Sequence, residues 1–109
     1  MGYCSTVAIT LDKQVQQDFE IKVVANLFSQ SLTAESILPE PAEENDESIL
    51  YTWECVKWYR SYVEVDAIMK ALAKLKKETF LFLRSGEESF DYEEAGTYKD
   101  VFKLKPTTR

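Results

Sequence analysis

The 109-residue sequence contains no histidine, three glycines, three prolines and two cysteines. Without histidine, the chain lacks the commonest general base, the commonest zinc ligand and the base of every Ser-His or Cys-His nucleophile. Two cysteines are too few for a disulfide framework, and both Cys4 and Cys55 lie in apolar stretches. We therefore interpret both as buried free thiols that pack as small hydrophobic side chains.

Long hydrophobic runs are also absent. No apolar run approaches the length of a membrane span, and the start MGYCSTVAIT lacks the basic residues that open a signal peptide. The Met-Gly start and Thr6 fit a myristoylation pattern loosely. Residues 3–11 are more typical of a buried first strand, which would leave no free arm, so we expect a cytoplasmic protein.

Positive charge is scarce in the first half of the chain. Residues 1–56 carry two basic and ten acidic side chains, whereas residues 57–109 carry eleven basic and nine acidic ones. The net charge of −6 argues against nonspecific binding to nucleic acid or to an anionic membrane, because both require cationic surface.

Hydrophobic residues, in contrast, are plentiful. They make up 45% of the chain, and aromatic residues make up 13%, well above the content of a disordered segment. The length is typical of one domain with a real core, so we expect residues 1–109 to form a single domain.

The clearest pattern lies in residues 49–78, ILYTWECVKWYRSYVEVDAIMKALAKLKKE. They predict a strand that runs through a tight corner into a helix. Ser61 followed by Glu64 matches a capping box, in which each side chain satisfies a backbone N–H at the helix start. One apolar stripe then follows at helical spacing, formed by Val65, Ile68, Met69, Leu72 and Leu75.

The strand over residues 48–59 has an irregular alternation. In a regular strand Tyr51, Trp53 and Cys55 would point one way, and Val56 and Trp58 the other. Three explanations remain open: the strand is covered on both faces, a bulge shifts its phase near Cys55, or one aromatic group is exposed and contacts a partner. Core packing is the commoner fate of a single tryptophan.

Two elements are predicted before this strand. Residues 3–11 alternate as an interior strand with Val7, Ile9 and Leu11 on one face. Asp12 is a good N-cap for a helix over residues 13–30. Its apolar stripe would comprise Val15, Phe19, Val23 and Leu27, widened by Val24 and Phe28. Residues 19–25 also alternate as a strand would, but no turn precedes them, so we favour the helix.

Residues 30–48 predict a long acidic loop. Pro39 and Pro41 disfavour regular structure, and Ile37 with Leu38 would be its anchor on the body of the protein. A solvated surface excursion and a partner-binding arm both remain open for this loop.

After the helix, residues 79–84 are strongly β-prone. A turn at Gly86 leads into an acidic cluster formed by Glu87, Glu88, Asp91, Glu93 and Glu94. Gly96 then precedes an expected last strand over residues 97–105, in which Lys99, Lys103 and Lys105 would protect a sheet edge.

This order predicts an α+β two-layer sandwich of ferredoxin-like character. Its mixed four-stranded sheet would carry both helices on one face. If the other face is uncovered, its aromatic side chains need the long loop as a lid or a second subunit, so a homodimer is expected.

Several blocks of sequence resemble one family. They are MGY at residues 1–3, WECVKWY at 53–59 followed by SYVEVDAIM at 61–69, and FLRSGEE at 82–88. These blocks resemble small uncharacterised proteins of phages and prophages, and they cover about half of the chain. The acidic loop is not part of the shared pattern, and Arg84-Ser85 replaces more hydrophobic residues. The resemblance implies an accessory gene acting inside a bacterium and brings no catalytic residues.

We therefore expect a non-enzymatic protein that binds a bacterial host protein, as an inhibitor or anti-defence factor, without cofactor, metal, nucleic acid or membrane. Tryptophan and tyrosine are over-represented at binding hot spots, and acidic side chains can steer a protein to a basic surface. The candidate contact residues are Trp53, Trp58, Tyr59, Glu87, Glu88, Asp91, Glu93 and Glu94.

Two alternatives remain open, the first a sharper form of the binding role and the second an enzyme. In the first, spaced carboxylates imitate DNA phosphates and occupy a nucleic-acid-binding groove, although thirteen basic residues weigh against it. In the second, a metal-dependent enzyme binds Mg²⁺ through Asp91-x-Glu93-Glu94 or Glu43-Glu44-x-Asp46, neither of which has the spacing of a known loop.

Overall fold

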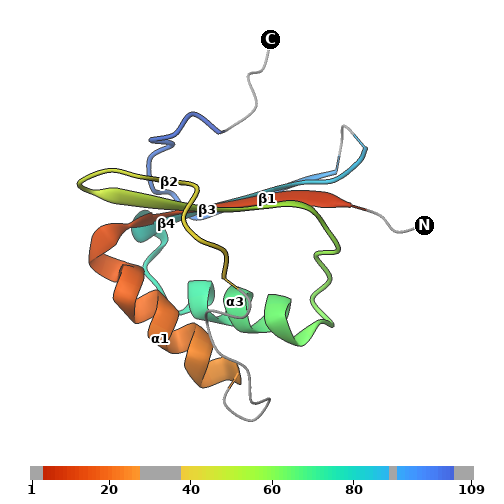
Figure 1. Ribbon diagram of the computed structural model, residues 1–109, viewed down its shortest axis with the longest axis horizontal. Coiled ribbons are helices and arrows are strands. Elements are labelled where there is room, and N and C mark those ends of the chain that lie inside the picture. The colour runs from red at the N-terminus through yellow and green to blue at the C-terminus, as the bar shows by residue number, and fades with distance from the viewer. Residues whose placement is uncertain (1–3, 28–37, 89–90, 105–109) are drawn as a thin grey trace.

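The computed structural model describes residues 4–27, 38–88 and 91–104 (Figure 1). Short 3₁₀ turns at Lys13–Val15 and Lys77–Thr79 precede α1 and β4. In these residues the helices are α1 (Gln16–Leu27) and α3 (Val63–Ala73), and the strands are β1 (Ser5–Asp12), β2 (Glu43–Glu44), β3 (Ser48–Val56), β4 (Phe80–Ser85) and β5 (Tyr92–Ala95).

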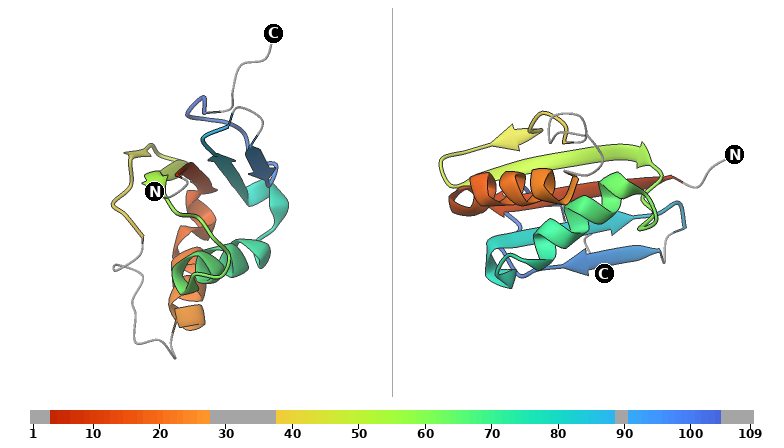
Figure 2. Two further views of the ribbon diagram at one scale, coloured as in Figure 1. Left: turned by 90° about the vertical axis from the view of Figure 1, so that its right-hand side faces the viewer. Right: turned by 90° about the horizontal axis from the view of Figure 1, so that it is seen from below.

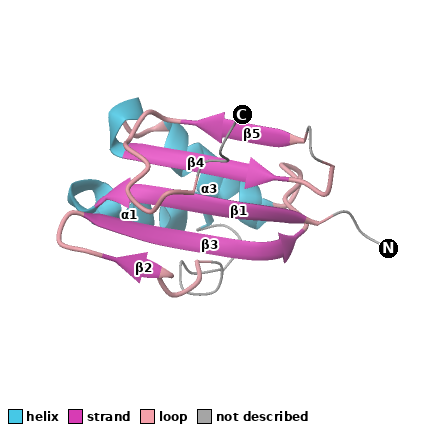
Figure 3. Ribbon diagram, turned by 90° about the horizontal axis from the view of Figure 1, so that it is seen from above, coloured by secondary structure: helices cyan, strands magenta, loops and turns pink. Residues whose placement is uncertain are grey.

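The strands form one sheet in the order β2-β3-β1-β4-β5, and every neighbouring pair is antiparallel. Both helices lie on one face of the sheet (Figures 2 and 3). The α+β class is confirmed, but the expected mixed four-stranded sheet is wrong, because the described residues form a five-stranded antiparallel one. Tyr92–Ala95 adds an edge strand where the sequence indicated only an acidic turn.

The predicted interior strand is confirmed by β1, which pairs with β3 on one side and β4 on the other. Its side chains Val7, Ile9 and Leu11 are fully buried under the helices. At its end the Asp12 carboxylate accepts the backbone N–H of Gln14 at 2.9 Å and caps the 3₁₀ turn that leads into α1.

Residues 16–27 are helical, which decides between the helix and strand interpretations of this segment. Phe19, Val23 and Leu27 are buried as expected. The expected widening of the stripe by Val24 is wrong, since that side chain is 39% exposed, and Phe28 lies outside the described residues.

The apolar stripe of α3 is also confirmed, and it packs on the sheet. The capping box is wrong: Tyr62 occupies the N-cap position, and no side chain caps the helix start there. Ser61 therefore lies one residue before the cap and Glu64 one residue before N3, so neither can make the reciprocal bonds of a capping box.

The expected long loop contains a short strand. Asn45 Oδ1 accepts the backbone N–H groups of Glu47 and Ser48 at 2.8 and 2.7 Å, which closes a tight turn between β2 and β3. Leu38 packs against the core as the expected anchor, whereas Ile37 lies outside the described residues.

The outer face of the sheet is covered at β4 by the chain's own C-terminal segment. Tyr98, with Val101 and Leu104, packs on Leu81 and Leu83 of β4. The expected strand over residues 97–105 is wrong. Gly96 has a φ of +85°, which turns the chain away from the sheet edge and across its face. Lys99 and Lys103 lie in this covering segment, and Lys105 lies outside the described residues.

Candidate functional site

A β-bulge at the end of β3 positions the aromatic side chains of this region. Ser5 pairs with Val56 and Val7 pairs with Trp53, so one residue of β1 faces two of β3. Cys55 lies in the bulge and has a φ of +50°, a left-handed conformation that costs a non-glycine residue about 1–2 kcal/mol. Of the three explanations left open by the sequence, the bulge is therefore present.

The bulge brings the two tryptophans together. Their ring centroids are 5.2 Å apart at an interplanar angle of 56°. Trp58 also lies 6.3 Å from the ring of Phe82 in β4. Both tryptophans are partly buried against the core, so their main role in the fold is packing.

An exposed apolar surface continues from the tryptophans to the start of α3. We call Trp53, Trp58, Tyr59, Tyr62 and Val63 the aromatic corner. Tyr59, Tyr62 and Val63 are 40%, 43% and 40% exposed, and the two tyrosine rings meet edge to face with centroids 5.4 Å apart. Sequence reasoning singled out Tyr59 and missed Tyr62 and Val63, because it placed the helix start at Ser61.

A shallow hollow of about 250 Å³ opens at this corner. The buried indole N–H of Trp58 has no hydrogen-bond partner, and a buried donor of this kind normally has one. Exposed Lys57 and Arg60 flank the turn that leads to α3. The hollow is lined by Trp53, Val56, Lys57, Trp58, Tyr62, Glu64, Val65 and Ile68.

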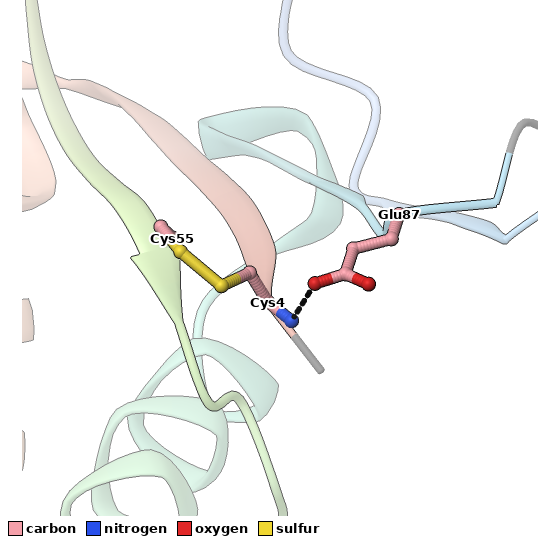
Figure 4. Close-up of a disulfide and its surroundings, with 3 residues drawn as sticks. All are labelled: Cys4, Cys55 and Glu87. Carbon is pink, nitrogen blue, oxygen red and sulfur yellow. Dashed lines mark hydrogen bonds between the residues drawn. A yellow bond between two sulfur atoms is a disulfide. The ribbon is translucent and has the colours of Figure 1, made fainter. Parts of the chain in front are cut away.

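Beside the aromatic corner, a disulfide joins Cys4 to Cys55 (Figure 4). The interpretation of both cysteines as buried free thiols is therefore wrong: they are bonded, Cys55 is exposed and Cys4 is half-buried. Antiparallel pairing of β1 with β3 brings their Cα atoms to 4.5 Å although 51 positions separate them in sequence. No local pattern around either cysteine could have indicated this pairing.

The acidic cluster is bound into the β4–β5 hairpin. Arg84, whose side chain is only 13% exposed, contacts Asp91 at 2.6 Å and Glu93 at 2.9 Å. These hydrogen bonds raise the pKa of Arg84, and the bond to Asp91 makes the largest contribution. The Glu87 carboxylate accepts the backbone N–H of Cys4 at 2.8 Å (Figure 4). The single positive charge of Arg84 thus offsets part of this negative charge, and a backbone N–H holds the Glu87 carboxylate.

The remaining carboxylates of the cluster lie around the same hairpin. The Tyr92 hydroxyl donates to Glu94 at 3.1 Å, and burial, together with this bond, raises the pKa of Tyr92 to about 12. The backbone carbonyl of Glu88 accepts the N–H of Asp91. The cluster and the aromatic corner come from different elements, and the disulfide lies between them at this end of the sheet.

The two carboxylate groups considered as magnesium ligands do not converge in the structure. Glu93 and Glu94 are consecutive residues of β5 and point to opposite faces of the sheet. Glu44 forms an ion pair with Lys13 at 2.7 Å. Within residues 4–27, 38–88 and 91–104, no group of three histidine, cysteine, aspartate or glutamate side chains could hold a metal ion.

A second hollow, of about 330 Å³, lies between α1 and residues 38–41. At its wall the Tyr51 hydroxyl donates to Glu20 Oε2 at 2.7 Å. Burial, with the Glu20 carboxylate, raises the pKa of Tyr51 above its ordinary value. Sequence reasoning missed this pair, because a strand and a helix 31 positions apart give no common signal.

Comparisons with protein-family models, curated proteins and solved structures return no match for this chain. Neither α1 nor α3, the helices of the described residues, has the length and apolar character needed to cross a membrane.

Proposed function

We propose that this protein is a non-enzymatic accessory protein of a phage or prophage that binds a protein of the bacterial host, as an inhibitor or anti-defence factor, in the host cytoplasm. The phage origin rests on the sequence resemblance. The observation that carries the binding role is the exposed aromatic corner, where Tyr59, Tyr62 and Val63 extend a tryptophan pair into solvent.

The aromatic corner has the composition of a binding hot spot. Tyrosine and tryptophan contribute large contact areas and lose little conformational entropy on binding, and arginine is the third residue type enriched at hot spots. Here Arg60 lies between the two exposed tyrosines in sequence.

The acidic cluster supports a secondary role in the same proposal. Asp91 and Glu93 are held by Arg84, which makes the hairpin a fixed acidic surface with part of its charge neutralised. Such a surface orients an encounter with a basic partner more than it adds affinity. DNA mimicry, the alternative, requires carboxylates whose charge is free to replace phosphates.

We also propose a ferredoxin-like arrangement of the fold and a homodimeric assembly. The order β1-α1-β2-β3-α3-β4, with β3 between β2 and β1, supports a ferredoxin-like split β-α-β arrangement extended by β5. The homodimer was expected on an uncovered second face of the sheet, but the C-terminal segment packs on that face at β4. The homodimer stays a prediction, now with the aromatic corner as the surface a second copy would bury. Sedimentation of the wild type beside Tyr59→Ala/Tyr62→Ala tests it, since loss of a dimer in the variant would place its interface there.

The binding function is tested by affinity capture of the tagged protein from bacterial lysate, followed by affinity measurements with the captured partner. We expect Tyr59→Ala/Tyr62→Ala to weaken binding by about tenfold or more, mainly through faster dissociation. The matched control is Ile21→Ala/Val24→Ala, which removes exposed apolar side chains from α1 (58% and 39% exposed) and should leave the affinity unchanged.

The role of the acidic residues is tested with amide substitutions that keep their hydrogen-bond acceptors. Glu87→Gln, Glu88→Gln and Glu94→Gln avoid the carboxylates that Arg84 holds. If the cluster steers binding, association slows and its salt dependence flattens, while dissociation changes little. DNA mimicry would be favoured over the aromatic corner by two results together: only the variant with the three amide substitutions loses affinity, and DNA competes with the protein for the partner. Unchanged binding in both variant sets would contradict the proposal.

A further inference from the structure

The Cys4–Cys55 disulfide is open to solvent on one side. Cys55 is exposed at the end of β3, and Cys4 is half-buried at the start of β1 (Figure 4). A thiolate can attack a disulfide only at a sulfur that it can reach. Cys55 is the more exposed of the two residues, so we take Cys55 Sγ as the point of attack. The Glu87 carboxylate, which accepts the Cys4 N–H at 2.8 Å, lies on the other side of the bond.

The same disulfide holds the bulge that shapes the aromatic corner. Cys55 stands in the left-handed conformation within the bulge, between Trp53 and Trp58 in sequence. Beyond the bulge, the Ser5–Val56 pair is the only one between β1 and β3 among the residues that the structure describes. Residues 57–59 have no regular structure. The crosslink is therefore a principal restraint on the end of β3.

We propose that Cys4–Cys55 is a thiol–disulfide exchange site whose oxidation state controls the aromatic corner. This inference rests on the proposed function for its biological role, although its chemistry does not depend on a partner. The co-reactant is a small dithiol or a pair of monothiols, such as glutathione.

The exchange proceeds in two successive thiolate attacks. A reductant thiolate attacks Cys55 Sγ, a mixed disulfide forms at Cys55, and Cys4 leaves as a thiolate that takes up a proton from water. A second reductant thiolate then attacks the reductant's sulfur, which releases the Cys55 thiolate and the oxidised reductant. Two electrons pass from the reductant to the protein, and the reverse sequence restores the disulfide.

The redox conditions of the compartment determine which oxidation state of the disulfide is populated. Disulfides are rare in the cytoplasm, where thiols are kept reduced, and those that form there are usually transient or redox-sensing. In the proposed host cytoplasm, the oxidised form would accumulate under oxidative stress. Oxidation fixes the bulge and pre-organises the aromatic corner, whereas reduction frees the end of β3 and adds an ordering cost to partner binding.

The test uses the full-length oxidised protein with dithiothreitol in the absence of denaturant. Thiols are trapped with N-ethylmaleimide and counted by mass, and backbone amide exchange is followed along the chain. We expect complete reduction while the protein stays folded, with exchange in residues 53–62 accelerating about tenfold and exchange in residues 19–27 unchanged. Cys4→Ser/Cys55→Ser should show the faster exchange with or without dithiothreitol.

Single variants compare how readily each of the two sulfurs reaches glutathione. With oxidised glutathione, Cys4→Ser should form a mixed disulfide at exposed Cys55 faster than Cys55→Ser forms one at half-buried Cys4. Equal rates, or the reverse order, would overturn the assignment of Cys55.

Two further outcomes would overturn the inference. A disulfide that resists dithiothreitol until the protein unfolds is not an exchange site. A disulfide that is reduced without faster exchange in residues 53–62 does not control the aromatic corner. Both readouts are independent of any partner, so either failure leaves the binding function standing. Loss of the binding function would instead appear as unchanged affinity in Tyr59→Ala/Tyr62→Ala.

Discussion

Trp53 and Trp58 pack against each other with ring centroids 5.2 Å apart, although five positions separate them along the chain. In a regular strand an odd separation places two side chains on opposite faces. The extra residue at the Cys55 bulge restores them to one side, where Trp58 reaches Phe82. One inserted residue thus unites the aromatic side chains that the proposed interface uses.

The stripe of α3 gives a first prediction. Leu72 is 2% exposed, and Leu72→Ala should lower the free energy of unfolding by about 2–5 kcal/mol, because it leaves a cavity between helix and sheet. Ile21→Ala, at a 58% exposed position of α1, is the matched control and should change it by less than about 0.5 kcal/mol. Denaturant titration measures both, and equal effects would contradict the packing of α3 described above.

The turn after β5 gives a second prediction. A Cβ on Gly96 would collide with the backbone oxygen of Phe80 and lie 2.7 Å from its ring, and the φ of +85° is itself unfavourable for other residues. Gly96→Ala should therefore destabilise the protein by at least about 2 kcal/mol. The thermal midpoint measures the loss. A midpoint equal to that of the wild type would mean that the C-terminal segment crosses the sheet differently.

Arg84 gives a third prediction. Its guanidinium contacts Asp91, Glu93 and the Ser5 hydroxyl, the last at 2.8 Å. Arg84→Met should cost about 1.5–3 kcal/mol of stability, since it removes charged hydrogen bonds to the partly buried Asp91 and to the more exposed Glu93. Lys22→Met breaks an exposed ion pair with Asp18 and should cost less than about 0.5 kcal/mol. Chemical denaturation at low and high salt measures the loss of stability in both variants. If the loss in Arg84→Met were salt-sensitive and as small as that in Lys22→Met, the β4–β5 hairpin would not depend on Arg84.

The tyrosines give a fourth prediction, at alkaline pH. Burial raises the pKa of Tyr51 above its ordinary value, and that of Tyr92 to about 12, from 10.0. The folded protein therefore retains these protons to a higher pH than the unfolded chain does. The stabilising contribution of Tyr92 is complete below pH 10 and is lost as the pH rises through 12. That of Tyr51, whose pKa is raised further, is lost at still higher pH.

Ultraviolet absorbance of phenolate, recorded together with a fold-sensitive signal, measures this effect. Tyr51→Phe and Tyr92→Phe should each remove one late-ionising group and reduce the loss of stability above pH 10. Ionisation of every tyrosine in a single step near pH 10, with the fold intact, would contradict the prediction.

The local patterns of the sequence determined the helices and most of the strands. The spacing of Val65, Ile68 and Leu72 predicted α3, and the alternation of Val7, Ile9 and Leu11 predicted β1. Asp12 marked the boundary between β1 and the helical segment that follows. These features depend on neighbours within one or two turns, so the sequence expresses them directly.

Only the tertiary structure decided which of these elements meet. The Cys4–Cys55 bond, the Tyr51–Glu20 hydrogen bond and the Arg84 ion pairs join positions whose contact depends on strand order and register. The direction of the C-terminal segment was decided at Gly96, where a positive φ and close contact with Phe80 turn the chain over the sheet. Such contacts arise when separate elements pack against one another, and no short stretch of sequence contains the information that selects them.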